Sequence, residues 1–487
     1  MGSVKTLGWL SATLLAGVFA PALAVTDAER IAAYREFRAQ FDARQYAAAQ
    51  PLAENLVRLT EAQYGAEELQ LTNPLTNLAT VHYKLGNFPA AIENYQRTLR
   101  ILQAKSTLAD KAQIRPLHGL GISFMGANDP ESAVVALKRA ADLSRNTDGL
   151  FNIGQVEFID ALIDAYGATG RWAEAEKEAL YAKRVEEAAY GRNSIKLLDR
   201  YDKLARFYES ERRYTSERAV YELALNVLAR NAPENDLRRV GPLRGVARAF
   251  RLEAFYGAEG ADQGATFNAG TNGAPVFSDG TQQRRGESSL LAAMQIVEGN
   301  APVNQDLRGQ VLTDLGDWYL SFNALRRAYD TYSEAWKAFV EGGSTKLLER
   351  PRILTYRPSI SSVDRSSLDP AEAEVKSVEL HFRVERDGRL EDMSSPTTDV
   401  PEMVVKNSMA SMKRSRFAPR IENGLAVPTD NVVFVERVLV RLTTQEQPAT
   451  SSGSAEEKKA GESKAEESKP EAPKPATSTE SPPQASR

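Results

Sequence analysis

The sequence predicts a mainly α-helical chain: a right-handed α-solenoid of about seven helix pairs, followed by a small α/β domain and a disordered tail. Three observations predict this organisation. Packing residues recur every 42 residues through the first half of the chain, apolar residues alternate with polar ones after residue 375, and the segment after residue 442 lacks aromatic residues, valine, isoleucine and leucine. A fixed period of this length is typical of stacked helix pairs.

The 42-residue period is marked by a bulky residue and, three positions later, a small one. These marks are Tyr46 and Ala49, Phe88 and Ala91, Pro130 and Ala133, and Trp172 and Ala175, whereas Tyr214 is followed by Glu217. Small residues let neighbouring helices approach closely, and large residues fill the gap made by the next pair. The pattern therefore predicts the second helix of each pair.

The first helix of each pair is predicted from an aliphatic residue with an aromatic residue or histidine four positions later. Residues four apart lie on one face of a helix, so both members can enter the core. The members are Leu78 and His82, Leu120 and Phe124, Leu162 and Tyr166, Leu204 and Tyr208, and Val246 and Phe250.

Turns between the two helices of a pair are predicted at Leu85-Gly86-Asn87, Ala127-Asn128-Asp129 and Thr169-Gly170-Arg171, because glycine and asparagine tolerate a left-handed cap. Over roughly residues 28–255 these marks resemble tetratricopeptide repeats, in the 42-residue form of kinesin light chain. The resemblance implies a concave groove that binds protein or peptide partners.

The repeat array is expected over residues 25–341, with a glycine-rich insertion at residues 256–287. The insertion holds seven glycines and interrupts the sixth pair. It is either a disordered loop or a binding loop, since long loops in compact domains are often functional. The second helix is expected to resume near residues 288–297, and a seventh pair to end at Gly342-Gly343.

The N-terminus has the features of a secretory signal peptide over residues 1–24. Lys5 precedes an apolar run, and Ala22-Leu23-Ala24 forms a small-residue cleavage site before Val25. Export to the periplasm is the expectation. The alternative is an uncleaved anchor in the inner membrane that faces the periplasm, since the run approaches the length that spans a bilayer.

Beyond the array, residues 342–374 contain three prolines and are predicted as a linker. Residues 375–442 are predicted to form a domain, because Val378, Leu380, Phe382 and Val384 alternate with polar residues as in a half-buried strand. Asp387-Gly388 predicts a turn before a short strand that includes Leu390. A helix follows over residues 401–412, and residues 432–442 form the last strand.

This order of elements resembles the C-terminal domain of TonB-type energy transducers. The matching pieces are Asp387-Gly388-Arg389, Arg416-Phe417-Ala418-Pro419, Gly424, Val427 and the closing strand. In such a domain we expect Phe417 to pack against the sheet, Pro419 to stop the helix exit, that is, the segment that leaves the helix, and Gly424 to permit a turn. The resemblance implies a domain that pairs with a strand of another protein. The chain departs from such transducers in its cleavable leader, its helical array and its tail.

The tail, residues 443–487, is rich in serine, proline, lysine and glutamate and is expected to be disordered. The composition excludes several classes of site. The chain has no cysteine, its three histidines are spread over two repeat helices and a strand, and no zinc or phosphate motif is present. No metal, cofactor or enzymatic activity is expected. The net charge of −4 gives no reason to expect a nucleic-acid partner.

The tetratricopeptide resemblance also implies which first-helix residues face the groove. The predicted partner-binding residues are Asn73, Thr76, Thr80, Tyr83, Asp160, Asp164, Asp202, Arg206, Arg244, Arg248 and Arg251. They predict a groove that passes from acidic to basic and would orient a charged peptide, although a solvated face with intrahelical ion pairs is the alternative.

Taken together, these features predict an exported, non-enzymatic adaptor in the periplasm. Its repeat groove would bind one protein partner, and its TonB-like domain another, with an outer-membrane receptor as a candidate. The alternative is a TonB-type energy transducer for outer-membrane transport, which would keep its N-terminal segment as a membrane anchor.

Overall fold

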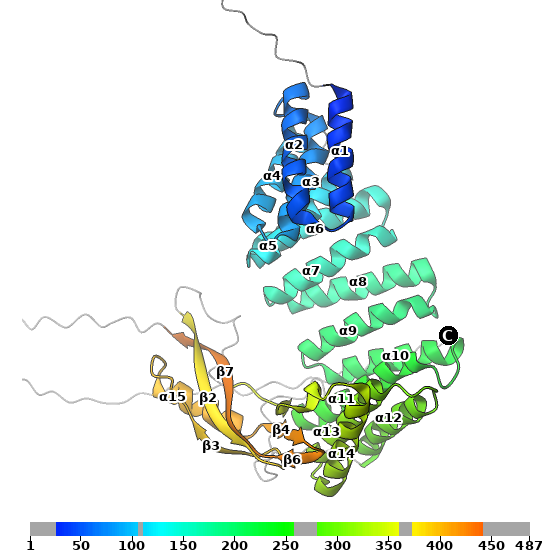
Figure 1. Cartoon of the computed structure of the whole chain (residues 1–487), viewed down its shortest axis with the longest axis vertical. Helices are drawn as coiled ribbons and strands as arrows, with labels where there is room; N and C mark the ends of the chain where they lie inside the picture. The colour runs from blue at the N-terminus through cyan, green and yellow to red at the C-terminus, as the bar shows by residue number, and fades with distance from the viewer. Residues whose placement is uncertain (1–25, 106–110, 258–279, 360–372, 442–487) are drawn as a thin grey trace, which may run out of the picture. The chain divides into compact units, whose positions relative to one another are not determined.

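The computed structural model describes residues 26–105, 111–257, 280–359 and 373–441. Within these residues, fourteen helices form seven pairs, each pair packed against the next (Figure 1). The pairs are α1 (Asp27–Asp42) with α2 (Tyr46–Tyr64), α3 (Thr72–Lys84) with α4 (Phe88–Lys105), α5 (Ile114–Gly126) with α6 (Pro130–Asp148), α7 (Val156–Ala168) with α8 (Trp172–Tyr190), α9 (Leu198–Ser210) with α10 (Tyr214–Asn231), α11 (Val240–Tyr256) with α12 (Gly280–Glu298), and α13 (Gln305–Ser321) with α14 (Leu325–Gly342).

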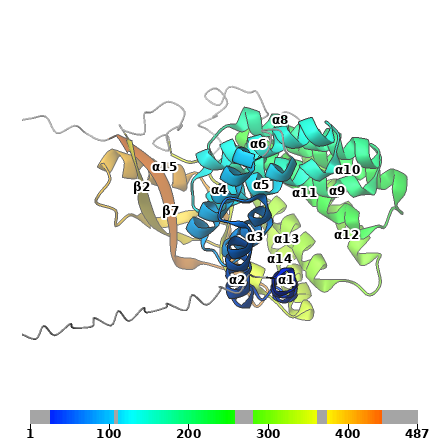
Figure 2. The same ribbon diagram turned by 90° about the horizontal axis from the view of Figure 1, so that it is seen from above.

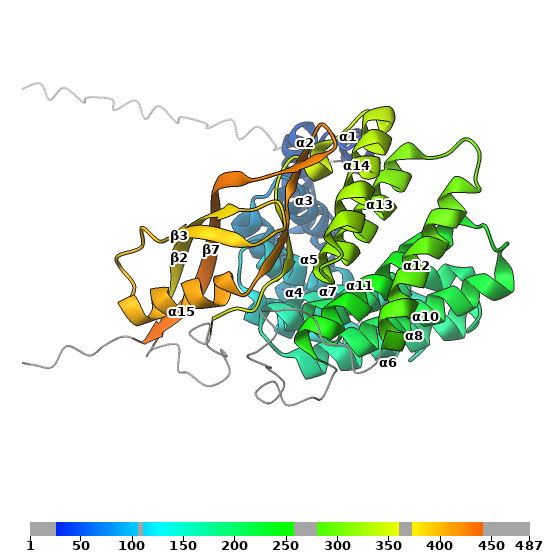
Figure 3. The ribbon, with the colours of Figure 1, turned by 90° about the horizontal axis from the view of Figure 1, so that it is seen from below.

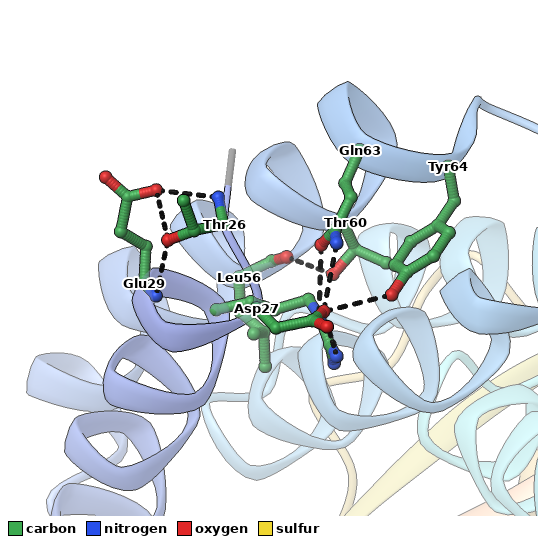
Figure 4. Close-up of polar contacts among 8 residues, drawn as sticks. Thr26, Asp27, Glu29, Leu56, Thr60, Gln63 and Tyr64 are labelled. Carbon is green, nitrogen blue, oxygen red and sulfur yellow. Dashed lines mark hydrogen bonds and ion pairs between the residues drawn. The ribbon is translucent and has the colours of Figure 1, made fainter. Parts of the chain in front are cut away.

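The first helix begins with a capping box. The Thr26 backbone N–H donates to Glu29 Oε2 at 2.8 Å, and the Glu29 N–H donates to Thr26 Oγ1 (Figure 4). Asp27 Oδ1 then accepts hydrogen bonds from Gln63 Nε2 at 2.9 Å and from the Tyr64 hydroxyl at 3.2 Å. These bonds fix the start of α1 against the end of α2.

The 42-residue prediction is confirmed in its register. The second helices α2, α4, α6, α8 and α10 begin at the bulky residues that mark the period, from Tyr46 to Tyr214. The predicted turns contain left-handed residues at Gly86, Asn128 and Gly170. The same position is left-handed at Arg44 and Arg212, so the repeat imposes this conformation even without glycine.

The alanines of the period are buried where paired helices meet. Ala49, Ala91, Ala133 and Ala175 have no exposed surface. In α5 the approach is closer still, because a Cβ on Gly121 would lie 2.4 Å from Leu137 Cγ. The small-residue prediction is therefore confirmed, and its physical reason is the short distance between helices.

The sixth pair differs from the prediction at one boundary. The helix α12 begins at Gly280, whereas the glycine-rich insertion was expected to continue to residue 287. The polar stretch between Thr281 and Arg285 contains residues that are compatible with a helix, and Gly286 is buried where a Cβ would lie 2.1 Å from the ring of Trp318. Gly286 therefore marks close packing between helices rather than a loop. Residues 258–279 lie outside the described residues.

The C-terminal region contains seven strands and one helix among the described residues. They are β1 (Arg352–Thr355), β2 (Ala373–Val384), β3 (Leu390–Ser394), α15 (Glu402–Lys413), β4 (Arg416–Ala418), β5 (Arg420–Glu422), β6 (Leu425–Val427) and β7 (Thr429–Arg441). The strands β3, β2 and β7 form an antiparallel sheet in that order, and β2 and β7 run side by side along most of their length (Figure 2). Two smaller antiparallel pairs are β1 with β4 and β5 with β6.

The alternation predicted for β2 is confirmed. Val378, Leu380, Phe382 and Val384 are buried, and they pack with Phe417 under α15, which lies along the sheet (Figure 3). The Asp387-Gly388 turn is also present, with Gly388 in the left-handed region. A Cβ there would lie 1.9 Å from the carbonyl oxygen of Phe417, so this turn requires glycine.

Two expectations for this region were wrong. The segment 342–374 is not only a linker, because β1 lies inside it and pairs with β4 through Ile353 and Phe417. Pro419 does not end the helix exit. It lies between β4 and β5, six residues after α15 has ended at Lys413. Short strands of this kind are hard to predict because their partners are distant in sequence.

The array ends against this strand region. Leu354 of β1, Ala418 and Ile421 belong to the same buried cluster as Leu315 and Tyr332 of the seventh pair. A terminal helix pair in a repeat array needs a cover for its apolar outer side. Here the small strands β1, β4, β5 and β6 supply it. The expected signal peptide and tail lie outside the described residues and stay predictions.

Candidate functional site

The groove pocket is a cavity of about 760 Å³ between the first helices of the last three pairs. It is lined mainly from α9, α11 and α13, and its apolar floor includes Tyr221, Leu290 and Trp318. Repeated first helices expose one face each, so their stacking forms this concave surface. The lining also includes charged residues of both signs.

The structure brings some of the predicted groove residues together and leaves others apart. Five of them line the groove pocket: Asp202, Arg206, Arg244, Arg248 and Arg251. Asn73 and Thr76 line a second cavity, of about 440 Å³, between α3 and α5. Asp160, Asp164, Thr80 and Tyr83 line neither cavity.

Arg248 is held by two carboxylates at the floor of the groove pocket. Its Nη2 lies 2.9 Å from Glu209 Oε2 and 2.9 Å from Glu217 Oε1, and it donates to the Tyr221 hydroxyl at 3.2 Å. Glu217 is the residue that replaces the alanine of the 42-residue period, and its exposed fraction is 0%. A buried carboxylate at a packing position requires a cation, and Arg248 is that cation.

Burial raises the pKa of the Glu217 carboxyl to about 7, and Arg248 opposes this shift without cancelling it. Glu217 Oε2 has no hydrogen-bond partner among the described residues, which agrees with the direction of the pKa shift. A carboxyl group with a raised pKa therefore lies buried against Arg248, which lines the groove pocket.

The remaining arginines of the pocket are also paired within the chain. Arg244 forms an ion pair with Asp314 and donates to Gln310 Oε1 at 2.8 Å, and Arg206 lies 2.8 Å from Asp202. The groove was expected to pass from acidic to basic, but these ion pairs neutralise the charges locally. Across α9, α11 and α13 both signs are present, and the side chains of Asp199 and Arg206, 77% and 72% exposed, are highly accessible.

The acidic residues of the fourth pair have structural partners. Asp160 accepts a hydrogen bond from the buried Arg200 at 2.6 Å and a second from Lys203 at 3.0 Å. Burial raises the pKa of the Asp164 carboxyl, and the charge of Asp160 adds to this effect. Asp160 therefore anchors α9 to α7.

In the second pair, the polar residues form a ladder of local bonds. The Thr80 hydroxyl lies 2.9 Å from the Tyr95 hydroxyl, and the ring of Tyr83 lies 6.0 Å from that of Phe88. Thr76 donates to the carbonyl of Thr72 at 2.6 Å. Thr80 and Tyr83 therefore contact other residues of the array, whereas Asn73 lines the second cavity.

Residues that sequence reasoning missed join the groove pocket to the C-terminal strands. Arg251 Nη1 donates to the carbonyl of Leu354 in β1 at 3.0 Å. Asp317, which lines the pocket, accepts hydrogen bonds from Arg352 at 2.6 Å and from the Tyr332 hydroxyl at 2.7 Å. No sequence signal identified Asp317, because its partner Arg352 lies beyond the array in the segment predicted as a linker.

Tyr256, the last residue of α11, completes this connection. Its hydroxyl donates to the carbonyl oxygen of Tyr356 at 2.8 Å and accepts from the Tyr356 N–H at 2.6 Å. One side chain thus satisfies both backbone groups of a residue that follows β1.

The described residues contain no group of three or more histidine, aspartate or glutamate side chains arranged to hold a metal ion. None of the described helices combines the length and the apolar character that a membrane crossing requires. Residues 1–24 lie outside the described residues, so the expected leader stays a prediction.

Comparison with known proteins identifies the repeats. Residues 38–104 match the family model of the tetratricopeptide repeat. No curated protein sequence matches the chain.

Among solved structures, the chain is similar to TPR-like repeats of a Podosopora anserina protein assigned as a kinesin light chain (14% identity, 47% of this chain and 96% of that one, TM-score 0.37). It is also similar to the C-terminal part of a TPR repeat-containing protein from Cytophaga hutchinsonii (11% identity, 64% and 100%, TM-score 0.40). A third is a Rap protein in complex with competence and sporulation factor (12% identity, 64% and 75%, TM-score 0.33).

Tetratricopeptide repeats are typically non-enzymatic scaffolds for protein–protein interaction, and this is the general function that the match over residues 38–104 indicates.

Proposed function

We propose that this chain is an exported adaptor whose groove pocket binds an extended segment of a partner protein that carries both acidic and basic side chains. The observation that carries the proposal is the alternation of paired aspartate, glutamate and arginine side chains around an apolar floor. A partner segment can form ion pairs with exposed residues such as Asp202 and Arg206, while its apolar residues lie over the apolar part of the pocket lining. Charge complementarity would then set the orientation of the segment.

The choice of test residues follows from the geometry. Reversal of Arg248 is unsuitable, because it would leave the buried Glu217 facing a second carboxylate. Arg206 and Asp202 are suitable, since their ion pair is exposed and contributes little to folding. Lys177, exposed on the second helix α8, is a matched control outside the groove pocket.

A photo-crosslinking side chain placed at position 202 or 206 of the full chain should capture a periplasmic partner in cells, and the same group at position 177 should not. Arg206→Glu should then reduce the yield of the crosslink from position 202 by about tenfold, as expected for the loss of a contact worth roughly 1.4 kcal/mol. Equal capture from positions 202 and 177 would remove the groove pocket from the proposal.

Export is proposed from the leader at residues 1–24. N-terminal sequencing of the mature protein distinguishes the two candidate functions. Val25 as the first residue supports an adaptor in the periplasm. Retention of Met1 or Gly2 supports the alternative, a TonB-type energy transducer anchored in the inner membrane.

For the C-terminal region we propose a second binding surface, with an outer-membrane receptor as the hypothesis for the partner. Support comes from β7, which pairs with β2 on one side and exposes Val433 and Val435. Truncation at residue 341 is a poor test, since it removes β1 and uncovers the seventh pair. A crosslinker at position 433 of the full chain tests the surface directly. Capture of an outer-membrane protein supports this part of the proposal, and its absence under conditions where position 202 captures a partner would contradict it.

A further inference from the structure

Successive second helices of the array are joined by arginine–glutamate bridges. Arg97 of α4 pairs with Glu61 of α2, and Arg145 of α6 pairs with Glu178 of α8. The later gaps are bridged by the pairs Arg213 with Glu176, Arg285 with Glu222, and Arg327 with Glu287.

The gap between α4 and α6 has no such bridge among the described residues. The 42-residue period shows why. Arg139 and Gln103 occupy the positions that Arg97 and Glu61 hold one repeat earlier, so glutamine replaces the carboxylate. Arg139 instead donates to Gln113 Oε1 at 2.8 Å. A glutamine offers no charge to the arginine, and the gap stays open.

The result is an outer hollow of about 430 Å³ over α5. Leu117, Leu120 and Phe124 form its floor, and Val135 stands at its edge with 72% of its surface exposed. The positions equivalent to Val135 in neighbouring repeats are Pro51, Glu93, Lys177 and Ala219. An exposed β-branched apolar residue is therefore particular to this gap.

The charge around the outer hollow has one sign. Arg100 and Arg139 line it, no aspartate or glutamate does, and neither arginine forms an ion pair within the described residues. The groove pocket, in contrast, contains both signs. An apolar floor with two available guanidinium groups is complementary to apolar side chains flanked by carboxylates.

We infer that the outer hollow is a second docking site, separate from the groove pocket, for an amphipathic helix of a partner protein that presents leucine or phenylalanine side chains beside glutamate or aspartate. The space between two parallel second helices suits a helix that places its apolar side over α5, as in other helix-in-groove complexes. The carboxylates of that helix take the place that Glu61 has in the preceding gap.

The test uses three fluorescein-labelled synthetic helical peptides of about 16 residues. The first has leucine at helical spacing with glutamate on both sides, the second has lysine for glutamate, and the third has alanine for leucine. Fluorescence anisotropy with the full chain should show binding of the first peptide at least about tenfold tighter than binding of the other two.

Variants of the chain then locate the binding. Val135→Glu should weaken binding of the glutamate–leucine peptide by about tenfold, because it places a carboxylate at the apolar edge. Gln103→Glu should weaken it by about threefold, since it restores the bridge to Arg139. Lys177→Glu, the matched change in another gap, should leave the affinity unchanged. Circular dichroism melts confirm that each variant is folded.

The inference is overturned if the lysine peptide binds as tightly as the glutamate peptide, or if Val135→Glu and Lys177→Glu have the same effect. It is also overturned if the chain binds vesicles of anionic phospholipid in a Val135-dependent way and binds none of the peptides, because the hollow would then face a membrane surface.

Discussion

The first four helix pairs and the last three solve the same packing problem in different ways. In the first four, alanine occupies the closest contact between helices, and the buried clusters are small and local. In the last three, Glu217 of α10 replaces the alanine of the period, although alanine returns at Ala328 of α14, and a single large cluster continues from α9 into the C-terminal strands. The repeat therefore tolerates a buried charge where a residue distant in sequence supplies the opposite charge. The groove pocket lies in the part of the array that has such partners.

The largest effect is expected when a glutamate like Glu217 is placed at the equivalent position in one of the first four helix pairs. Ala133→Glu would place a carboxylate near Asp164, since position 164 stands 31 residues after 133, as Arg248 does after Glu217. We expect a loss of about 4 kcal/mol, because the new charge is buried without a cation. Urea denaturation followed by circular dichroism measures it.

The control for that change is the double variant Ala133→Glu with Asp164→Arg, which rebuilds the Glu217–Arg248 arrangement two repeats earlier. It should recover part of the lost stability. A single variant as stable as the parent chain would contradict the role assigned to Arg248.

The second test concerns the contact between the last helix pairs and the C-terminal strands. Asp317→Ala leaves Arg352 and the Tyr332 hydroxyl without their shared acceptor. We expect a loss of about 3 kcal/mol in stability. The shift in the urea midpoint is the measurement, and Asp199→Ala, which removes an exposed ion pair with Lys203, should shift the midpoint far less.

A smaller effect is expected from pH. Glu217 has its pKa raised from 4.5 to about 7 by burial, so the folded chain binds this proton more tightly than the unfolded chain. Its contribution is complete below pH 4.5 and is lost as the pH rises through about 7, by on the order of 2 kcal/mol.

Melting temperatures between pH 5 and pH 8.5 should therefore fall in the parent chain. They should fall much less in Glu217→Gln, which keeps the shape of the side chain without its titration. Parallel curves for the two proteins would show that another group causes the dependence.

The smallest effect is expected at the surface of the groove pocket. Arg206→Glu breaks an exposed pair with Asp202 and should change stability by less than about 0.5 kcal/mol. The same urea experiment measures it. A loss of more than 1.4 kcal/mol would mean that Arg206 has a structural role, and its use as a binding test would then be unsound.

The repeat was predictable because its packing marks lie at fixed positions, from Tyr46 to Tyr214, and each mark has a local physical reason. The strand β2 was predictable for the same reason, since alternation is a local pattern. β1 was not, because a four-residue strand depends on Phe417 and its neighbours far along the chain.

The groove residues were predicted from their positions in the repeat. Whether their charges are neutralised depends on ion-pair partners that the repeat positions do not identify. Asp314 lies 70 residues from Arg244, and only the folded chain shows that the two meet. Glu217 was visible in the sequence as a departure from alanine. Its meaning became clear only when its position next to Arg248 was known.

The double hydrogen bond between Tyr256 and Tyr356 has a mechanical consequence. Together with the bonds from Arg251 to Leu354 and from Asp317 to Arg352, it ties one stretch of backbone to both α11 and α13. A force applied to the C-terminal strands would act on these hydrogen bonds first. Two of the anchoring residues, Arg251 and Asp317, line the cavity between the helices, so a pull on the C-terminal strands would strain the cavity that we propose as a binding site.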